Sequence, residues 1–63
     1  MTNEEYMKLE SLAVDFVETH GRNANDQVLA MAEWLEANGF AGGDEEIETF
    51  GFAIKDEVRE VYG

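Results

Sequence analysis

The sequence contains no cysteine and no proline, and it has only four basic side chains and one histidine. Without cysteine, the chain cannot form a disulfide framework, a thiolate zinc site or a thiol nucleophile. No apolar run approaches the ~20 residues that a membrane-spanning helix needs. Residues 1–5 show no basic region followed by an apolar block, so we expect no secretory signal peptide and a cytoplasmic location.

Acidic side chains dominate what is present. Fifteen Asp and Glu residues give the 63-residue chain a formal net charge of −11 at neutral pH, and 44% of the residues are hydrophobic. This apolar fraction is enough for a single folded domain over residues 1–63 and too high for a disordered acidic tail. Because nucleic acids and anionic membranes are themselves polyanions, the charge argues against direct binding to either.

The spacing of apolar residues predicts three helices, over about residues 4–20, 26–37 and 45–62. Asp44 is placed to cap the third of them. The predicted fold is therefore an all-α, three-helix bundle. The expected core positions recur at helical spacing in each segment: Tyr6, Leu9, Ala13, Phe16 and His20; Val28, Met31, Ala32 and Leu35; Ile47, Phe50, Ile54, Val58 and Val61.

Polar residues and a glycine mark the helix ends. Thr2 and Glu5 have the spacing of a capping box, in which each side chain pairs with the other residue's backbone N–H, and Asn3 is a competing cap. Gly21 can adopt the positive φ that often ends a helix. Asn25 or Asp26 is expected to cap the second helix.

The third helix contains two residues that disturb its pattern. A glycine inside a helix costs about 1 kcal/mol relative to alanine, and Gly51 lies in the middle of this segment. Phe52 falls on the side opposite the apolar stripe, so it is exposed unless the helix breaks. An alternative interpretation is an α+β fold with two helices and a C-terminal β-hairpin, because Phe50, Phe52 and Ile54 alternate.

The sequence gives little support for catalysis or metal binding. His20 and Ser11 are the only residues of their types, and helical spacing places them on different sides of the first helix, whereas a nucleophile and its base need hydrogen-bond contact. Residues 23–26 lack the central glycine and terminal glutamate of a calcium loop. We therefore expect no enzymatic activity, no cofactor and no metal site.

The second helix is apolar around most of its circumference, which is typical of a helix that is central in a bundle or touches a second molecule. Self-association into a homodimer, or a role as a small structural subunit, is accordingly one of two functional hypotheses. The residues predicted to serve it lie off the main core stripes: Met7, Val14, Leu29 and Trp34.

The other hypothesis follows from the charge. Residues 1–21 carry five acidic side chains and residues 44–63 carry seven, so both outer helices are acidic. An ordered carboxylate array can replace a phosphate backbone in the basic cleft of a nucleic-acid-binding protein. The main predicted surface consists of Asp44, Glu45, Glu46, Glu48, Phe52, Asp56 and Glu60, with a second patch at Glu10, Asp15 and Glu18. In size and charge the chain resembles the small acidic antagonists that phages and mobile elements direct against restriction or CRISPR effectors, which implies a protein inhibitor acting as a DNA mimic.

Overall fold

The computed structural model describes residues 2–63. They form α1 over Asn3–His20, a short 3-10 helix η1 over Gly21–Asp26, α2 over Val28–Ala37 and α3 over Asp44–Tyr62. No strand occurs in this part of the chain, so the predicted all-α bundle is confirmed and the alternative with a C-terminal hairpin is wrong. None of the helices in residues 2–63 combines the length and apolar character needed to cross a bilayer.

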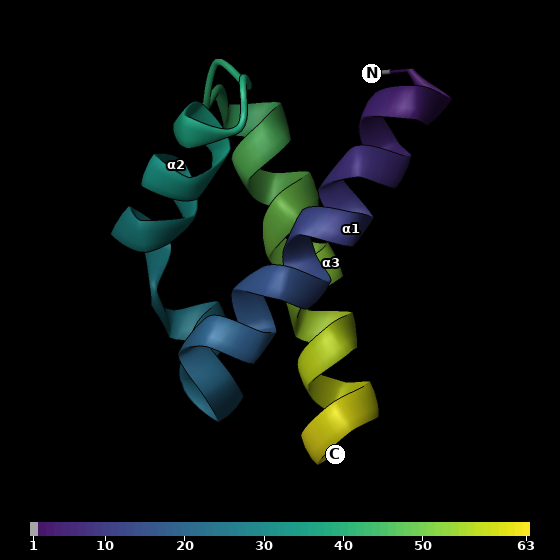
Figure 1. Ribbon diagram of the computed structural model, residues 1–63, viewed down its shortest axis with the longest axis vertical. Helices are drawn as coiled ribbons and strands as arrows, with labels where there is room; N and C mark the ends of the chain where they lie inside the picture. Colours follow the sequence, from purple (N-terminus) through teal and green to yellow (C-terminus); the bar gives the residue numbers. More distant parts are fainter. Residues whose placement is uncertain (1) are drawn as a thin grey trace.

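α1 and α3 run in the same general direction and cross each other (Figure 1). α2, which lies between them in the sequence, runs in the opposite direction. The most extensive helix–helix packing joins α1 to α3, and α2 packs mainly on α3. The start of α1 and the C-terminus lie at opposite ends of a body measuring 28 × 23 × 16 Å. The α1–α3 pair is therefore the structural frame of the domain.

Phe16 of α1 lies at the centre of the core. Its ring packs edge-on against Phe50 of α3, with 5.5 Å between centroids, and against Trp34 of α2 at 5.3 Å. One buried aromatic side chain thus connects all three helices, and such pairs are stabilising beyond their buried area. The buried core residues are Leu9, Ala13, Phe16, Val17, Ala24, Met31, Leu35, Phe50 and Ile54.

For three residues the prediction of a core position is wrong. Tyr6, Val28 and Val61 keep 49%, 58% and 57% of their surface exposed. Each lies near an end of its helix, and helical periodicity cannot tell whether another element covers a position.

The ends of α1 agree with the sequence prediction in part: Thr2 is the cap and Asn3 is the first helical residue, but only the Thr2 half of the predicted capping box forms. The Thr2 hydroxyl oxygen accepts a hydrogen bond from the Glu5 backbone N–H at 3.2 Å, and the hydroxyl donates to Glu5 Oε1 at 3.2 Å. Gly21 follows the last residue of the helix with φ of 77°. The capping side chain and the glycine therefore define α1 locally.

The connection into α2 differs from the prediction. The expected polar connector is part of η1, and Ala24 in it is buried in the core. Gln27 precedes α2 and makes no side-chain capping hydrogen bond. The prediction that Asn25 or Asp26 caps this helix is therefore wrong. The 3-10 helix η1 instead connects α1 to α2, and the Gln27 N–H at its end donates a hydrogen bond to the Ala24 carbonyl at 3.1 Å.

α3 runs unbroken through Gly51, and Phe52 is the exposed aromatic residue that one interpretation anticipated. Asp44 is the first residue of the helix rather than its cap. The start of α3 is held by Glu46, whose Oε1 accepts hydrogen bonds from the backbone N–H of Gly42 at 2.7 Å and of Gly43 at 3.2 Å. A carboxylate in the first turn also interacts favourably with the helix dipole.

Candidate protein-binding surface

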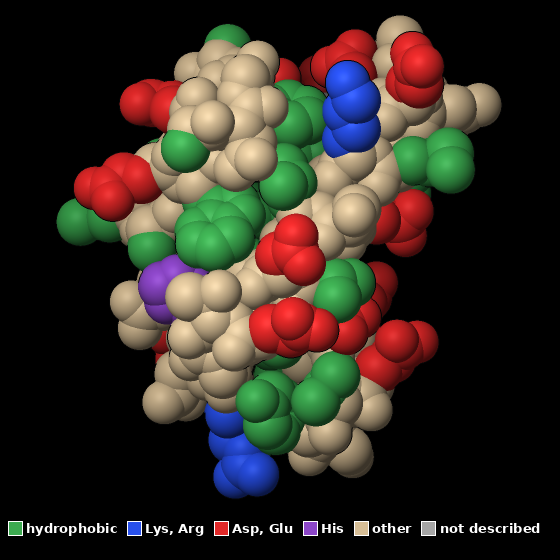
Figure 2. Space-filling model, in the orientation of Figure 1, with side chains coloured by type: hydrophobic (Ala, Val, Ile, Leu, Met, Phe, Trp, Pro, Cys, Tyr) green, Lys and Arg blue, Asp and Glu red, His purple; other side chains and the backbone are tan. Residues whose placement is uncertain are grey.

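The acidic side chains all remain at the surface: within residues 2–63 no charged or polar residue is buried. Figure 2 shows carboxylates along the edge where α1 crosses α3, and others on the opposite edge of the molecule, on α2. The carboxylates are therefore not confined to one face. A candidate binding site is a groove or pocket that several carboxylates line together.

Such a place is a groove between α1 and α3, with a volume of about 230 Å³. Three residues spaced four apart, and therefore on one side of α1, form one wall, and residues spaced three or four apart on α3 form the other. The lining consists of Tyr6, Glu10 and Val14 from α1 and of Ala53, Asp56, Glu57 and Glu60 from α3. We call this the α1–α3 groove.

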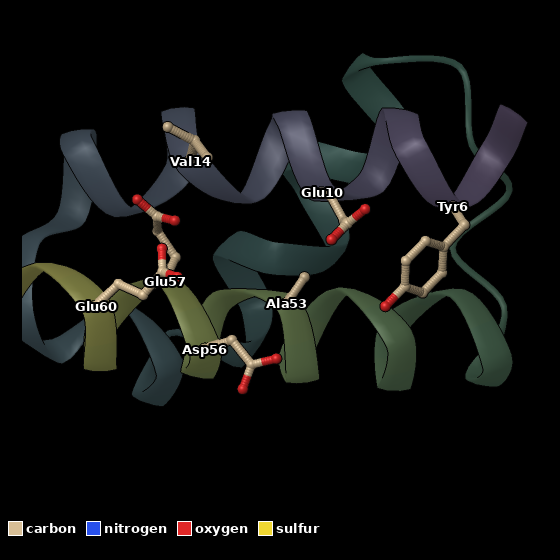
Figure 3. A pocket seen from close by; sticks show the side chains of 7 residues that line it. All are labelled: Tyr6, Glu10, Val14, Ala53, Asp56, Glu57 and Glu60. Atoms are coloured by element: carbon tan, nitrogen blue, oxygen red, sulfur yellow. The ribbon is translucent and has the colours of Figure 1, made fainter. Parts of the chain in front are cut away.

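The side chains of the α1–α3 groove differ in direction (Figure 3). Glu10 points from α1 towards α3, while Glu57 and Glu60 point from α3 towards α1. The Tyr6 ring reaches from α1 to α3 at one end. Asp56 points away from α1, so it lies at the rim. Glu57 and Glu60 lie together near Val14, and Glu10 lies between them and Tyr6.

The groove carries strong negative charge that the protein does not neutralise. Among the described residues, no Lys or Arg lines it, and no ion pair or hydrogen bond engages the carboxylates of Glu10, Asp56, Glu57 or Glu60. Glu57 is half-buried although it has no partner. Carboxylates that share a partly desolvated concavity attract cationic groups more strongly than fully hydrated ones, because the low-dielectric walls focus the field.

The structure brings together only part of the predicted surface. Glu10, Asp56 and Glu60 share the groove, although the sequence analysis assigned Glu10 to a separate patch. Their contact depends on how α1 and α3 cross, which helical spacing within one segment cannot reveal. The remaining predicted acidic residues of α1 and α3 do not line the groove: Asp15, Glu18, Asp44, Glu45, Glu46 and Glu48.

Two predicted residues have particular environments. Glu46 is half-buried and its carboxylate is occupied by the two backbone N–H groups at the start of α3, so its observed role is structural. Phe52, 60% exposed, lies one turn before Asp56 and therefore next to the rim of the α1–α3 groove.

Three residues that line the groove were not among the predicted binding residues: Tyr6, Ala53 and Glu57. Tyr6 was assigned to the core by periodicity. Ala53 and Glu57 are four apart on α3 and flank the core stripe. This spacing places both on one side of the helix, and it was the available signal in the sequence that they lie together.

The residues predicted for self-association differ in their surroundings. Met7 and Leu29 are 68% and 83% exposed, whereas Val14 lines the α1–α3 groove. Trp34 packs on Phe16 and is half-buried, and its indole Nε1 is buried without a hydrogen-bond partner. Two of these four side chains belong to α1 and two to α2.

His20 and Ser11 have separate surroundings. His20 stacks on Phe16, with 4.2 Å between ring centroids, whereas Ser11 lines a separate hollow near Phe40. Within residues 2–63, no three His, Asp or Glu side chains are arranged to hold a metal ion.

Comparison with known proteins adds no family: no family model, no curated protein and no solved structure matches this chain.

Proposed function

We propose that this protein is a non-enzymatic binding module that occupies the basic cleft of a nucleic-acid-binding protein and inhibits it by imitating nucleic-acid charge. The observation that carries the proposal is the α1–α3 groove, which is lined by carboxylates from two helices that have no basic partner among the described residues. A net charge of −11 on so small a body would steer it towards a cationic protein over long range. Exposed Tyr6 and Phe52 beside the carboxylates supply the aromatic anchors that interfaces favour.

The test begins with capture of proteins from a cell lysate at low salt and their release at high salt. Each captured protein is then mixed with labelled duplex DNA, and the acidic protein is titrated in. The proposal requires displacement of the DNA with an affinity that falls as salt rises. DNA binding that continues undisturbed at saturating acidic protein would contradict it.

A pair of double substitutions separates the groove from general charge. Glu10→Lys with Glu60→Lys reverses two carboxylates of the groove, and we expect inhibition to weaken about tenfold or more, since close charge pairs dominate such interfaces. Glu33→Lys with Glu36→Lys makes the same change in net charge on α2. An equal loss in both variants would mean that the groove has no special part in binding.

A second candidate function is self-association through α2. It is favoured by Val28 and Leu29, neighbouring apolar residues that are 58% and 83% exposed at the start of this helix. Apolar side chains exposed together often mark a protein contact. A homodimer of this kind would show a melting temperature that rises with protein concentration.

A further inference from the structure

A second hollow lies on a different side of α1, between this helix and the segment that follows α2. It has a volume of about 250 Å³ and is lined by Lys8, Ser11 and Leu12 of α1 and by Asn38 and Phe40. Figure 2 shows hydrophobic side chains gathered between α1 and α2 on this face of the molecule. No Asp or Glu of the described residues lines this hollow, in contrast to the α1–α3 groove. We call it the Phe40 hollow.

The apolar part of the Phe40 hollow is held in place by the core. Leu12 and Phe40 are half-buried side chains that pack against the buried core residues. The Phe40 backbone N–H donates to the Leu35 carbonyl at 2.9 Å, which ties Phe40 to the end of α2. The hollow is smaller than the roughly 300–1,000 Å³ of pockets that enclose drug-sized ligands. It therefore suits a single apolar side chain.

Three polar side chains complete the lining of the Phe40 hollow. Within the described residues, Lys8 takes part in no ion pair and the Ser11 hydroxyl in no hydrogen bond. Asn38 differs, because its amide nitrogen already donates to the Trp34 carbonyl at 2.7 Å. The oxygen Oδ1 of Asn38 is the atom that remains to accept a hydrogen bond. The hollow thus combines apolar surface with a cation, a hydroxyl and an acceptor.

The C-terminal residue of a peptide has groups that match this combination. Its carboxylate accepts hydrogen bonds from an ammonium and a hydroxyl, its backbone N–H donates to an amide oxygen, and its side chain lies close to both. A fatty acid has the carboxylate and the apolar chain, but it lacks the N–H that Asn38 can accept. An internal peptide segment lacks the carboxylate that pairs with Lys8.

We propose that the Phe40 hollow is a binding site for the free C-terminus of a peptide that ends in an apolar residue. The last side chain packs on Leu12 and Phe40, the carboxylate pairs with Lys8 and Ser11, and the last backbone N–H donates to Asn38. The hollow shares no residue with the α1–α3 groove, so this proposal goes beyond the proposed function and does not depend on it.

The experiment titrates small probes into the isotope-labelled protein and follows amide chemical shifts and the fluorescence of Trp34, the only tryptophan. The probes are acetyl-Ala-Ala-Leu with a free carboxylate, the same peptide as its C-terminal amide, acetyl-Ala-Ala-Ser with a free carboxylate, and hexanoate. We expect the leucine acid to bind about fivefold more tightly than its amide, as an exposed charge pair allows. It should bind about tenfold more tightly than the serine acid, because the serine peptide buries no apolar side chain.

The net charge of the protein cannot produce a preference for the free acid. A net charge of −11 repels an added carboxylate and therefore favours the amide. Lys8→Gln should abolish the preference for the free acid or reverse it. Lys55→Gln, the same change at an exposed position of α3 that does not line the Phe40 hollow, is the matched control and should preserve the preference.

Equal binding of the leucine acid and its amide, or a preference for the acid that survives Lys8→Gln, would overturn the proposal. So would hexanoate that binds as tightly as the leucine acid, since the hollow would then be a site for fatty acids. Shift changes centred on Ser11 and residues 38–40 support the site, and changes confined to other parts of the chain contradict it. The proposed function is tested separately, by displacement of DNA and by groove variants that leave the Phe40 hollow unchanged.

Discussion

α2 and the α1–α3 pair contrast in how composition relates to burial. Eight of the ten residues of α2 are apolar, yet only Met31 and Leu35 are buried, and Leu29 is 83% exposed. α1 and α3 carry most of the acidic side chains, and they form the principal packing of the domain. Core formation therefore depends on a narrow apolar stripe that faces another helix. A helix that is apolar on all sides buries few additional side chains when only one side is covered.

The largest expected effect concerns the contact at the centre of the α1–α3 pair. Phe50→Ala removes a fully buried ring that packs on Phe16 and should lower the free energy of unfolding by about 3–5 kcal/mol. Since a domain of this size has only a modest total stability, the variant should be largely unfolded at 25 °C. Urea denaturation followed by circular dichroism measures the effect. A loss below about 1 kcal/mol would show that α1 and α3 do not form the core as described.

A smaller effect is expected where α2 is joined to α3. Glu46→Ala leaves the Gly42 and Gly43 N–H groups without their acceptor and should cost about 1–2 kcal/mol. Glu48→Ala, at an exposed position without such a bond, is the control and should cost less than about 0.5 kcal/mol. Similar losses in both variants would mean that Glu46 acts only through the helix dipole. Thermal unfolding of the two variants side by side decides between these outcomes.

Gly51→Ala should stabilise the protein by about 0.5–1 kcal/mol. The position lies inside α3, has helical backbone geometry, and a Cβ placed there meets no atom within 4 Å. Gly21→Ala is the opposite case, because φ there is 77° and an alanine side chain would be strained. The melting temperature should rise for the first variant and fall for the second. A fall for Gly51→Ala would indicate that α3 bends at this residue.

The smallest expected effect concerns the exposed face of α2. Leu29→Ser should change the free energy of unfolding by less than about 0.5 kcal/mol, because the side chain is already largely in water. The melting temperature should also be independent of protein concentration, before and after the substitution. A concentration dependence that Leu29→Ser removes would instead favour the homodimer function and would mean that α2 is covered in solution.

Much of the fold could be predicted from local chemistry. The Thr2–Glu5 pair and Gly21 define α1, and the apolar stripe through Phe50 and Ile54 defines the buried side of α3. The 3-10 turn before α2 could not be predicted in this way, because Ala24 is held there by burial against other elements. Val28 was misassigned to the core for the related reason that no element covers the start of α2.

The sequence predicted the negative charge of the candidate site but not its geometry. Sequence analysis predicted Glu10, Asp56 and Glu60 as binding residues in two separate patches and did not include Glu57, whereas all four line one groove. Position along a helix tells which residues share a side of that helix. It does not tell which side of α1 meets which side of α3, and the groove depends on that crossing.

Local sequence was thus sufficient for the helical class of this protein and for its strong negative charge, since capping, apolar periodicity and ionisation are properties of short segments. A single groove lined by unpaired carboxylates of both helices arises only when α1 and α3 pack together. The physical reason is that packing of the buried rings sets how two helices cross, and that crossing decides which exposed side chains become neighbours.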